Sequence, residues 1–184
     1  MVYMFLAEGF EEVEALCPLD LLRRAGVRVA TVGVGTKVVR GSHGIEVIAD
    51  ITTAEAEKLL KKDAPEMVIL PGGMPGSVNL QKDAAVNSFI EAAVRSDAYI
   101  AAICAAPMII GELGFLKGKK ATCYPGFEDK LKGAILSDPT PGVAVDGKFI
   151  TGKGMGVALD FGLALVEAMV SKEKAEELRS AVQA

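Results

Sequence analysis

Histidine and cysteine are both scarce in this sequence of 184 residues. His43 is the only histidine, and the three cysteines, Cys17, Cys104 and Cys123, show no CxxC spacing. An odd number of cysteines without that spacing argues against a disulfide framework and indicates a reducing compartment, so we expect a cytoplasmic protein. A lone histidine with no ligand cluster around it argues against a zinc site. We therefore expect neither a metal nor a cofactor.

Basic clusters and long apolar runs are missing as well. The formal net charge is −4 and no lysine- and arginine-rich run opposes it, which argues against the basic surface that nucleic acids require. No apolar stretch approaches the roughly 18 residues of a membrane span. The first apolar run is short and meets acidic residues at once, unlike a signal peptide. We expect neither nucleic acid nor membrane among the partners.

The sequence does contain a regular alternation of short apolar runs and longer amphipathic segments. The runs expected to form strands are residues 2–6, 27–34, 67–70 and 99–103. Helices are expected from about residue 12 to 25, over 84–96, and from near residue 105. The alternation predicts one α/β domain over residues 1–184, with a mainly parallel sheet covered by helices on both faces.

Two segments depart from this rhythm. Residues 36–50 hold two β-like runs around a glycine turn, and residues 143–151 carry an Asp146-Gly147 pair between alternating runs, which is a strong hairpin signal. We expect both to be antiparallel ribbons added to the main sheet. We expect the last segment to form two helices, with Ser171 as the N-cap of the second.

Cys104 stands where the apolar run 99–103 gives way to a predicted helix. Parallel α/β proteins place their sites at such strand exits, and the small neighbours Ala105 and Ala106 suit a sharp turn. Pro107 fits a first helical turn, and a nearby helix N-terminus favours thiolate over thiol. Taken alone, the run equally fits a small buried cysteine that only packs.

Glu14 is the one charged residue in an otherwise apolar helical stripe with Phe10, Cys17 and Leu21. Burial there would raise its pKa and leave a carboxylic acid that can donate a hydrogen bond or exchange protons. The alternative is a solvated glutamate at the start of a helix. Pro18 cannot donate to the Glu14 carbonyl, so the helix is expected to kink or restart at this point.

The run LPGGMPGS, residues 70–77, follows an expected strand directly. Its glycines, Gly72 and Gly73, would let backbone N–H groups approach a ligand as an oxyanion hole requires, although a plain tight turn fits as well. The run lacks the P-loop pattern, and GKGMG at residues 152–156 lacks the dinucleotide-binding spacing.

Together, four segments resemble the ThiJ/PfpI superfamily in its DJ-1 group. They are EGFEEVEALCPLDLLRRAG, VILPGG, IAAICAAP and GKGMGVALDFGLALVEAM, in this order along the chain. The resemblance implies a flavodoxin-like three-layer sandwich with a nucleophile elbow, usually a homodimer. It implies that Cys104 is the nucleophile, a reactive thiolate beside a protonated Glu14. It also implies backbone donors for an oxyanion at Gly73 and Ala105, with Gly72 beside them.

This chain departs from relatives at two positions near the cysteine. Ala105 stands where the protease-like branch has histidine, and Tyr124 stands where some closer relatives have one, so Tyr124 is expected at most to donate a hydrogen bond. The remaining imidazole, His43, lies in a segment that relatives place near the dimer interface; it either reaches the partner's pocket or is simply solvated. Cys17 and Cys123 are expected to pack, with secondary oxidation as the alternative.

The resemblance supports two functions of different kinds. In the first, the protein is a glutathione-independent glyoxalase that converts methylglyoxal, a small α-oxoaldehyde, to lactate, with protein deglycase activity as an apparent consequence. In the second, it is a redox-sensing stress protein or chaperone in which Cys104 is oxidised to a sulfinate held by Glu14. Both need an activated Cys104.

Overall fold

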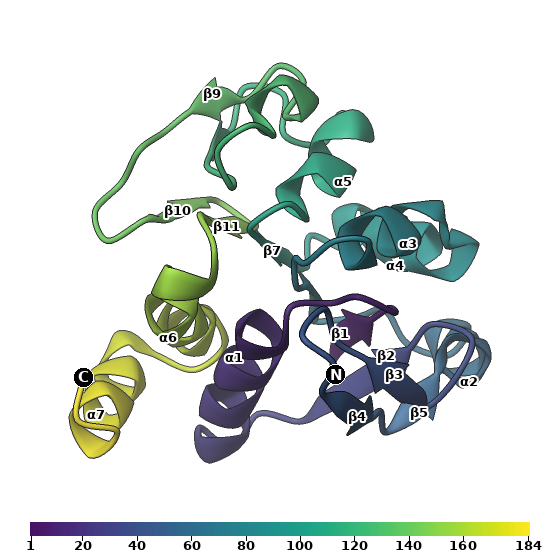
Figure 1. The fold of residues 1–184 in the computed structure, drawn as a ribbon. Coiled ribbons are helices and arrows are strands. Elements are labelled where there is room, and N and C mark those ends of the chain that lie inside the picture. Colours follow the sequence, from purple (N-terminus) through teal and green to yellow (C-terminus); the bar gives the residue numbers. More distant parts are fainter.

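A seven-stranded sheet forms the middle layer of the structure, a computed structural model that describes all residues from 1 to 184 (Figure 1). Every neighbouring pair of strands is parallel except β10 and β11, which form the antiparallel hairpin expected at Asp146-Gly147. The strand order is β10 (Val143–Asp146), β11 (Phe149–Gly152), β7 (Tyr99–Ile103), β6 (Met67–Leu70), β1 (Val2–Leu6), β2 (Val29–Gly33) and β5 (Ile51–Thr52).

Helices cover both faces of this sheet (Figure 1). One face carries α1 (Glu12–Arg24), α6 (Ala158–Met169) and α7 (Lys172–Ala181). The other carries α2 (Thr53–Leu60), α3 (Gly76–Lys82), α4 (Ala84–Arg95) and α5 (Pro107–Glu112). No helix is both long enough and apolar enough to span a lipid bilayer.

The buried strands explain why their sequences are apolar without alternation. Along β1, Val2, Met4 and Leu6 belong to the core under α1 and α6, whereas Tyr3 and Phe5 belong to the core under α4. All five residues are at least 97% buried, since both faces of the strand are covered. The predicted α/β sandwich is therefore confirmed.

The ribbon at residues 36–50 is antiparallel, but the prediction that it joins the main sheet is wrong. Its strands, β3 (Val38–Arg40) and β4 (Glu46–Ile48), form a sheet of their own, because β5 already occupies the edge beside β2. The ribbon instead bonds to the loop before α1: the Gly9 N–H donates to Arg40, and the Ser42 N–H donates to Phe10. This attachment brings the β3–β4 turn to the start of α1.

Of the two outcomes expected at Pro18, a kink or a restart, helix α1 does not show the restart. It runs unbroken from Glu12 to Arg24 with the proline inside. Packing against α6 holds this stretch: a Cβ at Gly162 would lie 2.9 Å from the Pro18 Cα, so the two helices meet at backbone contact. Tertiary packing thus outweighs the lost hydrogen bond.

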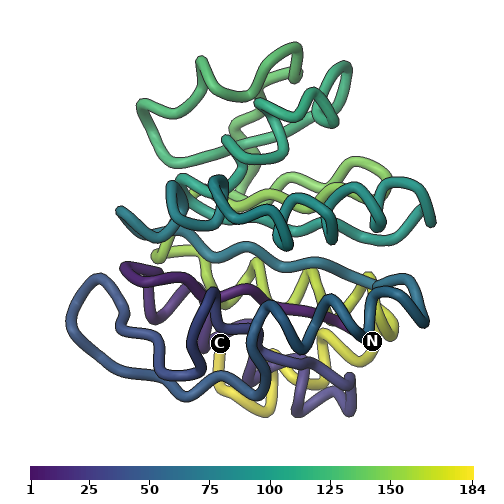
Figure 2. Tube along the Cα trace, turned by 90° about the vertical axis from the view of Figure 1, so that its right-hand side faces the viewer, coloured from purple at the N-terminus to yellow at the C-terminus, as the bar shows by residue number.

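The segment between α5 and β10 lies at one end of the molecule and is green in both views (Figures 1 and 2). It contains the short parallel pair β8 (Lys120–Ala121) and β9 (Ile135–Leu136) and a 3-10 turn, η1 (Glu128–Lys130). A second 3-10 turn, η2 (Met155–Val157), precedes α6. The green segment supplies Tyr124, which lines a cavity together with the loop before η2.

Candidate active site

Cys104 lies at the elbow between β7 and α5, in a backbone conformation that side chains rarely adopt. Its φ is +64°, in the left-handed region, which costs an L-residue about 1–2 kcal/mol. Strand β11 and the loop after β8 hold the strained residue: the Cys104 N–H donates to the Gly152 carbonyl, and its own carbonyl accepts from the Tyr124 N–H. The predicted elbow is confirmed, and it fixes the direction of the sulfur.

Glu14 lies beside this sulfur and is 1% exposed, so the solvated alternative is excluded. Its Oε2 accepts a 2.9 Å hydrogen bond from the Gly72 N–H, and the carboxyl lies close enough to the Cys104 thiol for each group to shift the pKa of the other. The three groups are so close that a Cβ at Gly72 would lie 2.5 Å from both the Cys104 Cβ and Glu14 Oε2. Only glycine fits at position 72.

Cys104 and Glu14 are close enough for the protonation of one to depend on the protonation of the other. Burial raises the pKa of Glu14 to about 7, although hydrogen bonds from Cys104 and Gly72 oppose the shift. Burial and then the Glu14 charge raise the pKa of the Cys104 thiol to about 12. Because sulfur and carboxylate cannot both be negative at this separation, a Cys104 thiolate requires that Glu14 hold the proton, which is the arrangement that the family resemblance implies. Between these values the pair carries one proton.

When the shared proton lies on Glu14, backbone N–H groups stabilise the negative charge on the Cys104 sulfur. The N–H groups of Gly73 and Ala105 hydrogen-bond the Cys104 sulfur and act to lower its pKa. Gly73 has a φ of +89°, and a Cβ there would lie 2.4 Å from the Glu11 nitrogen, so glycine is required. The Gly72 N–H is engaged by Glu14 and does not point at the sulfur.

A cavity of about 500 Å³ opens onto Cys104. Glu14 and Tyr124 line it, and Tyr124 is half exposed with its ring against Gly154. His43 lines the same cavity in its own chain, so reaching it needs no partner subunit. The sequence analysis did not single out Lys153, Met155 or Val157 on the facing loop. Nothing in their residue types sets them apart before the chain folds.

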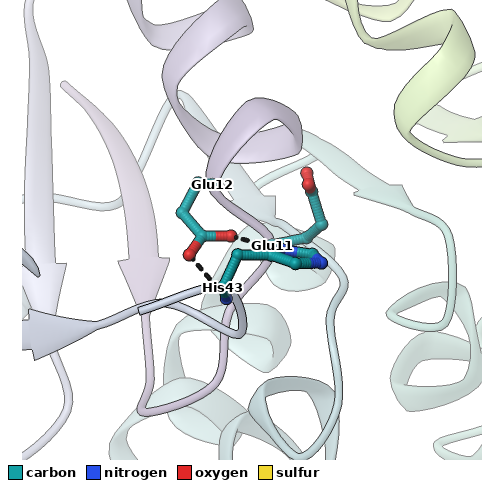
Figure 3. A group of neighbouring side chains, drawn as sticks. All are labelled: Glu11, Glu12 and His43. Atoms are coloured by element: carbon teal, nitrogen blue, oxygen red, sulfur yellow. Dashed lines mark hydrogen bonds and ion pairs between the residues drawn. The ribbon is translucent and has the colours of Figure 1, made fainter. Parts of the chain in front are cut away.

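Glu11, Glu12 and His43 form a cluster at the rim of this cavity (Figure 3). Atoms of these three side chains that could bind a cation lie within 4.8 Å of one another, so the expectation that nothing surrounds His43 is wrong. Their oxygens are already engaged, however. Glu12 accepts from the His43 backbone N–H at 2.8 Å and from its ring Nδ1 at 3.0 Å, and Glu11 accepts from the Glu14 N–H at 2.7 Å.

The other two cysteines lie outside the pair formed by Cys104 and Glu14. Cys17 is half-buried on α1, and burial followed by the Asp20 charge raises its pKa. Cys123 is buried, and burial raises its pKa to about 11. Neither hydrogen-bonds a carboxylic acid, which is consistent with packing roles.

The fold and the site together define a class: flavodoxin-like α/β proteins with a cysteine at a strained elbow and a protonatable glutamate beside it. The chain belongs to the DJ-1/PfpI family, whose model matches residues 1–168.

Relatives of known name match nearly the whole chain. Protein dj-1beta of Drosophila melanogaster is 34% identical over 178 residues, covering 95% of this chain and 92% of that protein. Protein DJ-1 homolog A of Arabidopsis thaliana is also 34% identical over 95% of this chain, but the chain spans only 44% of that longer protein. Glutathione-independent glyoxalase DJR-1.2 of Caenorhabditis elegans is 30% identical, covering 93% of this chain and 89% of that protein.

Solved structures agree with this assignment. A mutant of a DJ-1 superfamily protein from Salmonella typhimurium superposes with a TM-score of 0.91 at 31% identity, covering 99% of this chain and 97% of that one. Oxidized DJ-1 of Toxoplasma gondii superposes with a TM-score of 0.89 at 31% identity, with the same coverage. The family therefore includes a glyoxalase and a member solved in an oxidised form.

Proposed function

We propose that the protein is a glutathione-independent glyoxalase that converts methylglyoxal and similar small α-oxoaldehydes to α-hydroxy acids. The observation that carries the proposal is the contact between the Cys104 thiol and the buried Glu14 carboxyl in a cavity open to small molecules. The glyoxalase relative from Caenorhabditis elegans supports the same reaction class.

The chemistry begins when the sulfur of Cys104 adds to the aldehyde carbon and forms a hemithioacetal. The thiol proton passes through Glu14 to the carbonyl oxygen, while the N–H groups of Gly73 and Ala105 stabilise negative charge there. Glu14 then removes the proton from the former aldehyde carbon and delivers one to the neighbouring carbon. The first carbon is oxidised to a thioester and the second is reduced to an alcohol. Water finally releases lactate and the free thiol.

The test uses purified protein, methylglyoxal and no glutathione, with lactate followed by NMR. One lactate should form for each methylglyoxal consumed, because the sulfur is regenerated in every cycle. Consumption of methylglyoxal without lactate would reduce the protein to a stoichiometric aldehyde scavenger. Apparent deglycase activity is expected to follow the release of free oxoaldehyde from glycated amines and not to exceed that rate.

A second candidate function, redox sensing, is favoured by the oxidised form in which the Toxoplasma gondii relative was solved. A Glu14 carboxylic acid beside Cys104 could donate a hydrogen bond to a sulfinate and stop oxidation short of the sulfonate.

Under mild peroxide, Cys104 is expected to gain two oxygen atoms before Cys17 or Cys123 reacts. The reason is that only Cys104 shares a proton with a carboxyl group that can leave it as thiolate. Intact-mass analysis followed by peptide mapping checks this order. If Cys17 or Cys123 is oxidised first, the redox function is contradicted. In the control variant Cys104→Ser, the early addition of two oxygen atoms should be absent.

A further inference from the structure

The rim of the active-site cavity holds a carboxylate and an imidazole in the arrangement that serine proteases use to orient a base. We propose that His43, positioned by Glu12, is the general base that activates water to hydrolyse the thioester on Cys104. This inference rests on the proposed glyoxalase function and assigns its last step.

The β3–β4 turn is built around the Glu12 carboxylate. Glu12 is only 4% exposed, and its Oε1 accepts from the backbone N–H groups of His43 and Ile45. Gly41 makes this possible, since a Cβ there would lie 2.3 Å from the carboxylate carbon. The backbone of the turn is therefore fixed by the same group that binds the ring.

The His43 ring contacts Glu12 through one nitrogen, which leaves the other nitrogen free to accept a proton. Glu12 stays ionised, because hydrogen bonds from His43 and the backbone lower its pKa although burial alone would raise it. A carboxylate only accepts hydrogen bonds, so Nδ1 carries the proton and Nε2 is the acceptor. Nε2 has no partner in the protein, and the side chain is 72% exposed at the cavity rim. Figure 3 shows the Glu12 carboxylate turned toward His43.

The position of His43 suits removal of a proton from water better than removal of a proton from a substrate carbon. Glu14 is buried against the sulfur and can reach the carbons of a bound substrate, whereas His43 borders both cavity and solvent. Ala105, beside the sulfur, has no side-chain proton to exchange, and Tyr124 brings a phenol, not an imidazole, to the cavity. His43 is the one imidazole available for the hydrolytic step.

The step balances without an outside reagent. The water oxygen bonds to the thioester carbon while its proton passes to Nε2, and the tetrahedral intermediate then expels the Cys104 sulfur as the carbon–sulfur bond breaks. Lactic acid is released, and the proton on His43 returns to the sulfur or to solvent. No atom changes its oxidation state in this hydrolysis.

The charged groups around the His43 ring influence its pKa. Glu12 holds Nδ1, Glu11 adds negative charge from the same helix, Arg40 lies beside Gly44 in the ribbon, and Lys153 lines the cavity in an ion pair with Asp138. The hydrogen bond to Glu12 raises the pKa of His43 above its ordinary value of 6.5. Its basic form, and with it hydrolysis, should therefore appear as the pH rises through this raised value.

The experiment separates acylation from hydrolysis in single turnovers with methylglyoxal, using intact mass and lactate release. His43→Gln should leave acylation unchanged and slow hydrolysis about 10²-fold, so that a mass gain of one methylglyoxal molecule accumulates on Cys104. Glu12→Gln should lower the hydrolysis rate and also move its pH limb to lower pH, which a merely structural role would not do. Glu46→Gln, an exposed change in β4 of the same ribbon, should behave like the wild type.

Three outcomes would overturn the assignment. If wild type makes lactate and His43→Gln hydrolyses its adduct at the same rate, only this inference fails. If wild type forms neither adduct nor lactate, the proposed function fails and takes the inference with it. If a chelator stops hydrolysis in wild type and added zinc restores it, the cluster is a metal centre and the general-base role is wrong.

Discussion

Replacing Cys104 with serine is expected to lower kcat/KM for methylglyoxal by at least about 10³-fold. Serine keeps the size and the elbow, but its hydroxyl ionises far less readily than a thiol and cannot form the thioester on which the cycle depends. Steady-state rates of methylglyoxal loss and intact mass after a single turnover check the result. The variant should show neither turnover nor adduct.

The control for this change is the pair of single variants Cys17→Ser and Cys123→Ser. Neither residue lines the active-site cavity, so both variants should keep nearly full activity. A thermal melt of Cys104→Ser close to that of wild type would show that the loss is chemical. Retention of more than a tenth of the activity in Cys104→Ser would mean that another group is the nucleophile.

Replacing Glu14 with glutamine is expected to cost about 10²- to 10³-fold in kcat. The amide can still accept the Gly72 N–H, so the fold should survive, but it can neither take the thiol proton nor carry one between carbons. The pH profile should change in form. Wild-type activity should rise through the pKa of about 7 at which the pair loses its first proton.

In Glu14→Gln the rise of activity near pH 7 should vanish. Residual activity should appear only at alkaline pH, where the Cys104 thiol ionises by itself. The pKa of Cys104 would then fall from about 12, since the opposing carboxylate charge is gone, but burial would keep it high. Glu167→Gln, an exposed change on α6 outside the cavity, is the matched control. An unchanged limb near pH 7 in Glu14→Gln would show that another group titrates there.

Much of the fold could be predicted from local pattern. Strand β1 is apolar on both faces because both are covered, so five consecutive apolar residues predict its burial. The sequence analysis did not predict α2, although its capping box at Thr52 and Glu55 is visible in the sequence. The location of the β3–β4 ribbon could not be read locally, because it depends on β5 occupying the sheet edge and on bonds to residues 9 and 10.

The candidate site also contains features that the sequence predicts and features that only the fold reveals. Glu14 could be found because a charge in an apolar stripe violates the helix pattern, and the elbow could be found because small residues surround Cys104. His43 could be named as the lone imidazole, but its pairing with Glu12 could not be predicted, since the two residues lie 31 positions apart and only the folded ribbon brings them together. The coupling between the pKa values of Cys104 and Glu14 was also out of reach, because it depends on how closely the two groups approach in the fold. The homodimer and a chaperone role remain predictions from family resemblance, and the cytoplasmic location remains a prediction from the cysteine pattern.

The most direct test of the account is the initial rate of lactate formation without glutathione, measured side by side for wild type, Cys104→Ser and Glu14→Gln. The account predicts steady multiple turnover in wild type, none detectable in Cys104→Ser, and a rate reduced at least about 10²-fold in Glu14→Gln at pH 7. Equal rates in all three proteins would contradict it.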